Sequence, residues 1–143
     1  MKRILVPLDL TEESGAALPA VADMARGAGA TVRLLHVAED VTAVTDHGHV
    51  VVYVDQESAS RESAALDHLL GAAAAFEGVP VETVVRFGDP AEKILREAAD
   101  FEADLIVLGL RRAGLRRFAP GGIATHVCRA ADCAVMLLRP GSA

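Results

Sequence analysis

Aromatic residues and cysteines are scarce in this chain of 143 residues. It has no tryptophan, aromatic residues make up 3% of it, and its two cysteines are Cys128 and Cys133. The hydrophobic content of 52% must therefore come mainly from Val, Leu, Ile and Ala, which suits a parallel sheet covered by alanine-rich helices. The spacing of the cysteines matches no zinc-binding pattern, which favours buried free thiols in a reducing compartment.

Long apolar runs and an excess of positive charge are absent too. No segment approaches the ~20 apolar residues that span a membrane. The opening MKRILVPLDL contains an apolar stretch that is too short for a signal peptide and is followed too soon by a charged residue. We therefore expect a cytoplasmic protein. The net charge of -6 argues against nucleic acid as the main partner, because phosphate backbones need a basic surface.

Apolar runs of strand length alternate along the chain with longer helical patterns. This alternation predicts an α/β fold, one domain over residues 1–143, with a parallel sheet, right-handed crossovers and helices as its cover. The expected strands are 3–8, 31–37, 81–86, 104–108 and 134–138, and the expected helices are 11–26, 57–76, 91–101 and 122–130.

Local signals mark where helices begin and end. Asp89 before Pro90 is a strong helix-start pattern, an N-cap followed by proline at the first helical position. Thr11 is expected to cap the first helix, and Gly27 and Gly29 are expected to end it.

The second helix and the irregular segment before it carry weaker signals. We expect Leu66, Leu69 and Leu70 on the buried face of that helix. Residues 50–54 are expected to form a short extended piece.

A glycine-rich basic loop separates the fourth strand from the fourth helix. The loop runs from Gly109 to Gly122. A buried strand, such a loop and a helix N-terminus together form a place for an anion, because bare backbone N–H groups and the helix dipole favour negative charge. The alternative is that the glycines only make turns. The arginines of the loop are Arg111, Arg112, Arg116 and Arg117.

Three segments far apart in the sequence are expected to converge at one edge of the sheet. Asp9, Val37 and Gly109 each fall at the carboxyl end of an expected strand. Ligands of open parallel sheets bind beyond these strand ends, where the strand order reverses. We therefore expect one crevice lined by these three segments.

The chain as a whole resembles the universal stress protein family. The likeness is carried by ILVPLD at the start, LLHV at 34–37, GDPAEKILREAADFEADLIVLG at 88–109, GLRR at 114–117 and the closing ADCAVMLLRP. It implies a five-stranded parallel sheet in the order 3-2-1-4-5, Rossmann-like and similar to adenine nucleotide alpha hydrolases. It also implies a homodimer paired through the last strand. One branch of the family binds ATP through the pattern G-x2-G-x9-G-[S/T], and another branch lacks both the pattern and the binding.

The chain departs from this ATP-binding pattern at several positions. Gly109 matches the first glycine, but the loop to Gly114 is one residue shorter, so the second glycine is either deleted or replaced by Arg112. Gly122 takes the place of the Ser or Thr. The family's D-G-S stretch becomes D-L-T from Asp9 onward.

These departures predict weak or altered nucleotide binding. An arginine in left-handed backbone and a lost hydroxyl would together weaken a triphosphate about a hundredfold or more. Against this loss, Arg111 and Arg112 offer charge-assisted bonds to phosphate. Weak binding and no binding therefore both stay open.

The resemblance implies a nucleotide site and no catalytic residue. Asp9 and backbone groups of Val37 would contact adenine, and Pro7 and Leu8 would line the base pocket. The alternative for Asp9 is a helix cap or a bond to the next loop, and Val37, Pro7 and Leu8 also fit a strand interior. The expected ligand is ATP, with Mg²⁺, or AMP. The complete predicted site is Pro7, Leu8, Asp9, Val37, Gly109, Arg111, Arg112, Gly114, Gly121, Gly122 and Ile123.

The histidines give no strong signal for catalysis or for a resident metal. His36, within a strand, is expected to be packed and hydrogen-bonded. His47 and His49 have no cysteine near them to complete a metal site, and His126 is expected on a helix surface.

The last strand predicts self-association. An apolar strand at the edge of a sheet invites pairing, and a second copy of the chain satisfies its backbone about a two-fold axis. The alternative is a monomer whose edge its own C-terminal residues cover. The predicted interface residues are Val135, Met136, Leu137 and Leu138.

Three functions follow from these patterns. The first is a dimeric stress-response protein that binds an adenine nucleotide with little or no turnover. The second is an interaction protein whose crevice is vestigial. The third is a slow ATPase, which has the least support, because the sequence carries neither a Walker A motif nor a recognisable catalytic trio.

Overall fold

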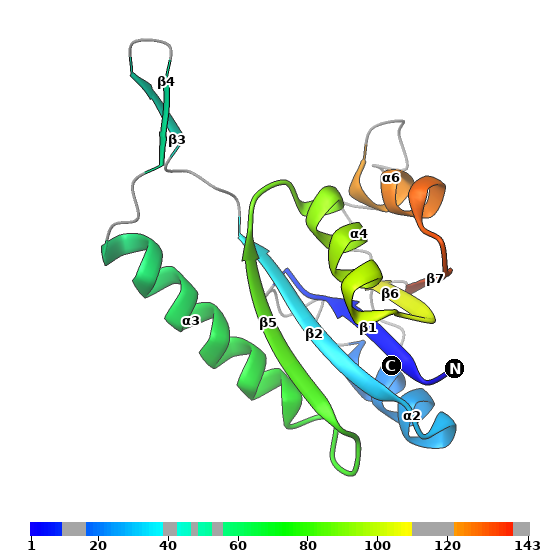
Figure 1. Ribbon diagram of the computed structural model, residues 1–143. Coiled ribbons are helices and arrows are strands. Elements are labelled where there is room, and N and C mark those ends of the chain that lie inside the picture. Colours follow the sequence, from blue (N-terminus) through cyan, green and yellow to red (C-terminus); the bar gives the residue numbers. More distant parts are fainter. Residues whose placement is uncertain (10–16, 39–42, 47–48, 53–55, 110–121, 139–143) are drawn as a thin grey trace.

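Five parallel strands form the central sheet of the protein (Figure 1). A computed structural model describes residues 1–9, 17–38, 43–46, 49–52, 56–109 and 122–138. The strand order β5-β2-β1-β6-β7 is the order 3-2-1-4-5 once a separate hairpin is set aside, so the predicted order is confirmed. The strands are β1 (Arg3–Pro7), β2 (Thr31–Ala38), β5 (Val81–Phe87), β6 (Leu105–Gly109) and β7 (Ala134–Leu138).

Helices cover both faces of this sheet, as Figure 1 shows. Successive residues of a strand point to opposite faces, so Ile4 packs with α2 and α3 whereas Leu5 packs with α4 and α6. Burial on both faces explains why the strands are continuous apolar runs in the sequence. The helices are α2 (Leu18–Ala28), α3 (Gln56–Ala73), α4 (Pro90–Phe101) and α6 (Ile123–Ala130).

Helix α4 begins where the sequence predicts. Asp89 is its N-cap in extended backbone, and its carboxylate accepts a hydrogen bond of 3.0 Å from the backbone N–H of Glu92. Pro90 takes the first helical position, where its missing N–H costs nothing. The helix ends at Glu102, a C-cap with a left-handed φ of 54°.

The end of helix α2 corrects one expectation. Gly27 lies inside the helix, and Gly29 alone ends it, with a φ of 65° and its N–H on the carbonyls of Ala25 and Arg26. Of the two glycines, only Gly29 has left-handed backbone, and this is the conformation that stops a helix. The predicted cap Thr11 lies outside the described residues.

Helix α3 corrects another expectation. Leu69 is buried and Leu66 half-buried, as predicted, but Leu70 is 61% exposed. One residue further along a helix lies about 100° around its axis, which turns Leu70 away from the core that Leu69 enters. The helix also ends at Ala73 rather than at Phe76, and a series of single turns connects it to Phe76.

A hairpin of β3 (Ala43–Asp46) and β4 (His49–Val52) was not expected from the sequence. Its strands are antiparallel, and Figure 1 shows it projecting away from the sheet and helices. The extended piece predicted at 50–54 corresponds in part to β4. His47 lies outside the described residues.

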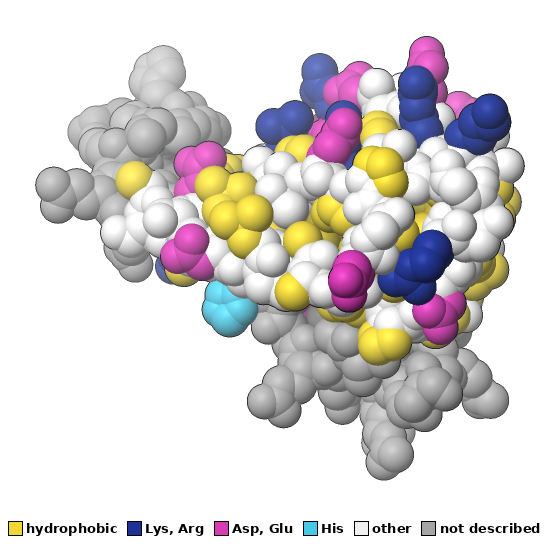
Figure 2. Space-filling view, turned by 90° about the horizontal axis from the view of Figure 1, so that it is seen from below, with side chains coloured by type: hydrophobic (Ala, Val, Ile, Leu, Met, Phe, Trp, Pro, Cys, Tyr) yellow, Lys and Arg dark blue, Asp and Glu magenta, His cyan; other side chains and the backbone are white. Residues whose placement is uncertain are grey.

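The described surface mixes charges of both signs. Figure 2 shows acidic and basic side chains interspersed over one side of the molecule, with apolar side chains between them. This side therefore presents no uniformly basic face of the kind that binds nucleic acid, as far as the described residues show.

Candidate functional site

The carboxyl ends of β1, β2 and β6 meet at one edge of the sheet, which we call the carboxyl edge. Pro7 pairs with Leu35, and continuing this register places Asp9 level with Val37. Leu5 pairs with Ile106, and the same extension places Leu8 level with Gly109. The structure thus brings together the three strand ends that the sequence singled out, with β1 between the other two.

Residues at the end of β1 differ in their surroundings. Leu8 is buried in the core beneath α2 and α3, and its N–H donates to the carbonyl of Leu35 at 2.8 Å. Pro7 is half-buried and Asp9 is exposed. Leu8 thus occupies a core position, which is the strand-interior alternative, and Asp9 is the first residue of β1's extension that faces solvent.

His36 joins β2 to the end of β1. Its Nδ1 lies 2.9 Å from the carbonyl oxygen of Leu8. Because a carbonyl only accepts, Nδ1 carries the proton, and in the neutral ring Nε2 is the acceptor. The histidine is packed and hydrogen-bonded, as the sequence analysis expects, and it fixes the backbone immediately before Asp9.

Helix α6 begins at the same edge, because it connects the carboxyl end of β6 to the amino end of β7. Gly122 is its N-cap, in extended backbone and without a side chain to cap the helix. The first N–H groups of a helix have no partner within it, so they are available to an acceptor from outside. Ile123 is 47% exposed, and His126 is exposed, as expected for a helix surface.

Several predicted site residues lie outside the described residues. These are Arg111, Arg112, Gly114 and Gly121, together with Arg116 and Arg117.

Strand β7 is an edge strand, but its side chains do not form a free apolar surface. It pairs with β6 along its whole length. Its side chains alternate between the two cores, Met136 and Leu138 beneath α2 and α3, Val135 and Leu137 beneath α4 and α6. In the described part of this edge, a partner would therefore contact mainly the backbone of β7, which has half-buried side chains on either side.

The opposite, amino edge of the sheet is held by side-chain bonds. The Asp104 carboxylate accepts from the backbone N–H groups of Lys2 at 2.7 Å and Arg3 at 2.9 Å. These two hydrogen bonds lower the pKa of Asp104 from its ordinary value of 3.8. Arg3 also donates to the Glu102 carboxylate and to the Phe101 carbonyl. The starts of β1 and β6 are thereby tied together.

The two cysteines differ, and one expectation about them is wrong. Both thiols are free, but Cys128 is exposed on α6, whereas Cys133 is half-buried before β7. Burial, with the charges of Asp104 and Asp132, raises the pKa of Cys133. The prediction of two buried thiols therefore fails for Cys128, because its position on α6 faces away from the core that Val127 enters.

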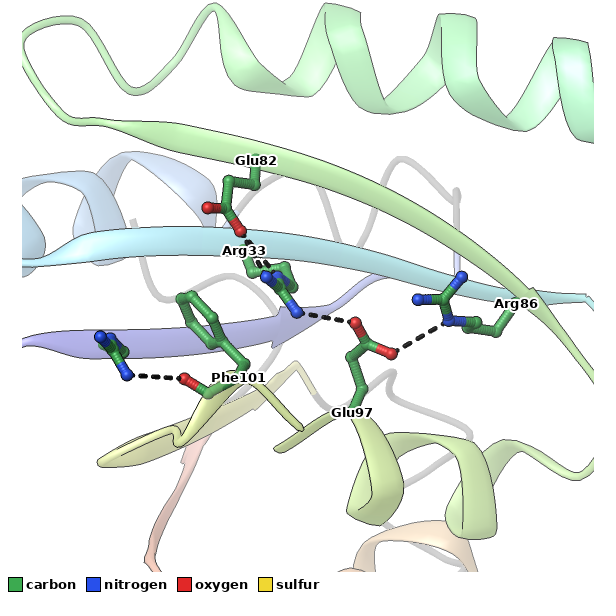
Figure 3. A network of polar contacts seen from close by, with 6 residues as sticks. Arg33, Glu82, Arg86, Glu97 and Phe101 are labelled. Carbon is green, nitrogen blue, oxygen red and sulfur yellow. Dashed lines mark hydrogen bonds and ion pairs between the residues drawn. The ribbon is translucent and has the colours of Figure 1, made fainter. Parts of the chain in front are cut away.

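A buried carboxylate on α4 was not predicted from the sequence (Figure 3). Glu97, with a side chain 3% exposed, accepts from Arg33 of β2 at 2.9 Å and from Arg86 of β5 at 3.1 Å. Arg33 also reaches Glu82 at 2.7 Å, and its guanidinium lies 4.2 Å from the centroid of the Phe101 ring. One signal pointed to this network, because Glu97 occupies the same helical stripe as Ile94 and Phe101.

This network fixes α4 on the sheet, and its member Arg86 is paired with Val37 in the ladder between β2 and β5. Among the described residues no group of three His, Cys, Asp or Glu side chains is placed to hold a metal. In the same part of the chain, no helix has the length and apolar character that crossing a membrane requires.

Comparison with known proteins agrees with this architecture. The model of the universal stress protein family matches residues 1–139. The universal stress protein YxiE of Bacillus subtilis is 28% identical over 145 residues, covering 96% of this chain and 98% of that protein.

Solved structures share the fold. The hypothetical protein MJ0577 superposes with a TM-score of 0.79 at 22% identity, over 99% of this chain and 98% of the other. A universal stress protein from Archaeoglobus fulgidus in complex with dAMP gives a TM-score of 0.65 at 19% identity, over 96% of this chain and 97% of the other.

Proposed function

Since this chain belongs to the universal stress protein family, we propose that it is a cytoplasmic stress-response protein that binds an adenine nucleotide at the carboxyl edge. The observation that carries the proposal is the convergence there of Asp9, Val37, Gly109 and the start of α6. Ligands of parallel sheets bind where neighbouring strands lead to opposite sides, and β1 lies at that point between β2 and β6.

The two ends of the proposed site suit the two ends of a nucleotide. The strand ends of β1 and β2 would hold the base, with Asp9 and the backbone of Val37 as its polar contacts. The N-terminus of α6 would hold the phosphate, because its N–H groups and dipole attract an anion. Arg111 and Arg112, of the loop before α6, would add positive charge.

AMP or ATP is the proposed ligand, and Mg²⁺ would accompany ATP. The related A. fulgidus protein was solved with dAMP, an adenine nucleotide with one phosphate. The departures from the G-x2-G-x9-G-[S/T] pattern concern the part that a triphosphate would use. We therefore propose that the chain binds weakly, with AMP retained better than ATP, and that it turns over little or no nucleotide.

The protein is also proposed to be a homodimer paired through β7. The backbone edge of β7 beyond its ladder with β6 supports this arrangement. Light scattering over a range of protein concentrations tests it. A dimer has twice the chain mass of 14.9 kDa, and a constant monomer mass would reject the pairing.

Thermal unfolding with added nucleotide tests the binding. A ligand that binds only the folded protein raises its midpoint, so millimolar AMP is expected to raise it by a few degrees, about 2–4 °C. Asp9→Asn is expected to remove most of this rise. Asp67→Asn, on the exposed side of α3, is the matched control and is expected to retain it.

The same experiment separates the proposal from its rival. If the wild-type midpoint does not move with AMP, ATP or ATP and Mg²⁺, the nucleotide function is rejected. The protein would then be an interaction module whose β7 edge is its working surface, and light scattering would show the dimer without any ligand effect.

A further inference from the structure

One hydroxyl at the start of α6 is buried without a partner. The Oγ1 atom of Thr125 is shielded from solvent and makes no hydrogen bond to any of the described residues. Buried hydroxyls in folded proteins are nearly always hydrogen-bonded, because leaving one unsatisfied is costly. An exception at this place calls for an explanation.

The usual partner of a helical threonine is not used. Threonine hydroxyls in helices commonly bond to the carbonyl three or four residues earlier. Thr125 Oγ1 makes no such bond to Gly122, whose carbonyl accepts instead from the N–H of His126 at 2.9 Å. The hydroxyl therefore keeps its full capacity to donate and accept.

Thr125 lies in the first turn of α6, close to the N-terminus of the helix. Thr125 is the third residue of α6, and helical Cα–Cβ bonds tilt toward the N-terminus. Residues three apart share a face, so Thr125 stands over Gly122, the N-cap that has no side chain. It is also the first hydroxyl of α6, and the remaining residues of the helix add none.

We infer that the Thr125 hydroxyl donates a hydrogen bond to a phosphate oxygen of the nucleotide, supplying the side-chain contact that Gly122 cannot make. This inference rests on the proposed function and adds a residue to its phosphate end. This phosphate would lie at the N-terminus of α6, where the N–H groups of the first turn have no partner within the helix.

Removing the Thr125 hydroxyl is expected to leave the stability of the free protein unchanged or raised and to lower its affinity for AMP. Thr125→Val replaces the hydroxyl by a methyl group of the same shape. Without ligand, the variant is expected to unfold at the wild-type midpoint or above it, because an unsatisfied hydroxyl has been removed. Its affinity for AMP is expected to fall about ten- to a hundredfold, because a hydrogen bond to a charged group has been lost.

Two further comparisons identify the contact. Affinity for adenosine, which has no phosphate, is expected to be the same in Thr125→Val and in the wild type. Thr125→Ser retains the hydroxyl and is expected to keep AMP affinity within about threefold. Thr83→Val, on β5, is the matched control for the chemical change and is expected to leave both affinities unaltered.

Calorimetric titration of the full chain with AMP and with adenosine decides the matter. Equal AMP affinity in Thr125→Val and wild type overturns the inference and leaves the proposed function intact. An equal loss for both ligands also overturns it, since the contact would not be to phosphate. So does a lower midpoint without ligand, which shows that the hydroxyl is satisfied within the protein.

Failure of the proposed function looks different. Wild-type protein that binds neither ligand rejects the nucleotide site altogether, and the role of Thr125 with it.

Discussion

The amino and carboxyl edges of the sheet are stabilised by different means. At the amino edge, Asp104 holds the backbone of Lys2 and Arg3, and Arg3 in turn reaches Glu102. At the carboxyl edge, Nδ1 of His36 lies 2.9 Å from the carbonyl oxygen of Leu8, and the hydroxyl of Thr125 has no partner among the described residues. Among the described residues, charged side chains join β1 to β6 at the amino edge, whereas a histidine joins β1 to β2 at the carboxyl edge, where the hydroxyl of Thr125 is unsatisfied.

The comparison separates the bonds that stabilise the fold from the edge where we propose that the nucleotide binds. Side chains that bond within the protein contribute to its stability, whereas side chains that contact a ligand contribute to its affinity. The ion pairs of Glu97 with Arg33 and Arg86 lie between α4 and the sheet, and they hold this helix in place. Substitutions in this network or at the amino edge should therefore alter the free energy of unfolding, and substitutions at the carboxyl edge should alter the affinity for nucleotide.

The largest expected effect comes from breaking the network under α4. Glu97→Ala leaves the partly buried guanidinium of Arg33 without its carboxylate, which is expected to lower the free energy of unfolding by about 3 kcal/mol. Urea unfolding measures this loss. Glu92→Ala, exposed on the same helix, is the control and should change the free energy by less than about 0.5 kcal/mol.

A Glu97→Ala protein as stable as wild type would contradict this division of the molecule. It would mean that packing of Ile94 and Phe101 alone holds α4 in place.

A smaller effect is expected where α2 ends near the amino edge. Gly29→Ala forces a side chain into left-handed backbone and should cost about 1–2 kcal/mol of unfolding free energy. Gly27→Ala, two residues earlier and within the helix, should instead stabilise by about 0.5 kcal/mol. Neither added methyl meets a neighbouring atom, so the two variants differ in backbone conformation alone. Urea unfolding of both measures the contrast, and effects of the same sign would contradict it.

The smallest effect is expected from Asp104, because its carboxylate is exposed. Its pKa is lowered in the folded state, so its contribution is present above the ordinary value of 3.8 and is lost as pH falls through the lower folded value. The midpoint of wild-type protein should exceed that of Asp104→Asn at pH 6. The difference should shrink toward pH 3.

Thermal unfolding of the two proteins between pH 6 and pH 3 measures this convergence. A difference that stays constant with pH would show that the two backbone hydrogen bonds do not depend on the charge of Asp104.

The elements of the fold were predictable because their signals are local. Apolar runs bounded by glycine and proline give the strands, and Asp89 with Pro90 gives the start of α4. The strand order is not a local property, and it came from the likeness to a family. The hairpin β3–β4 had no such signal beyond a short run of valines.

The positions of the candidate site residues were predictable to the level of strand ends and not to the level of contacts. Strand ends follow from the parallel arrangement, which puts Asp9 level with Val37. Which helical residue faces the core is decided by a rotation of about 100° per residue, so Leu70 was assigned to the wrong face. The pairing of Glu97 with Arg33 joins residues 64 positions apart, and no local pattern contains it.

The two lateral borders of the sheet have unequal capacities for growth. Strand β5 forms one border and carries Glu82 and Arg86, charged residues of the kind that discourage another strand from adding there. Strand β7 forms the other border and is AVMLL, without a charge. If only the β7 border can accept another strand, two copies that pair through β7 leave no second border for a third copy. The proposed self-pairing therefore closes into a dimer and does not propagate into a fibre.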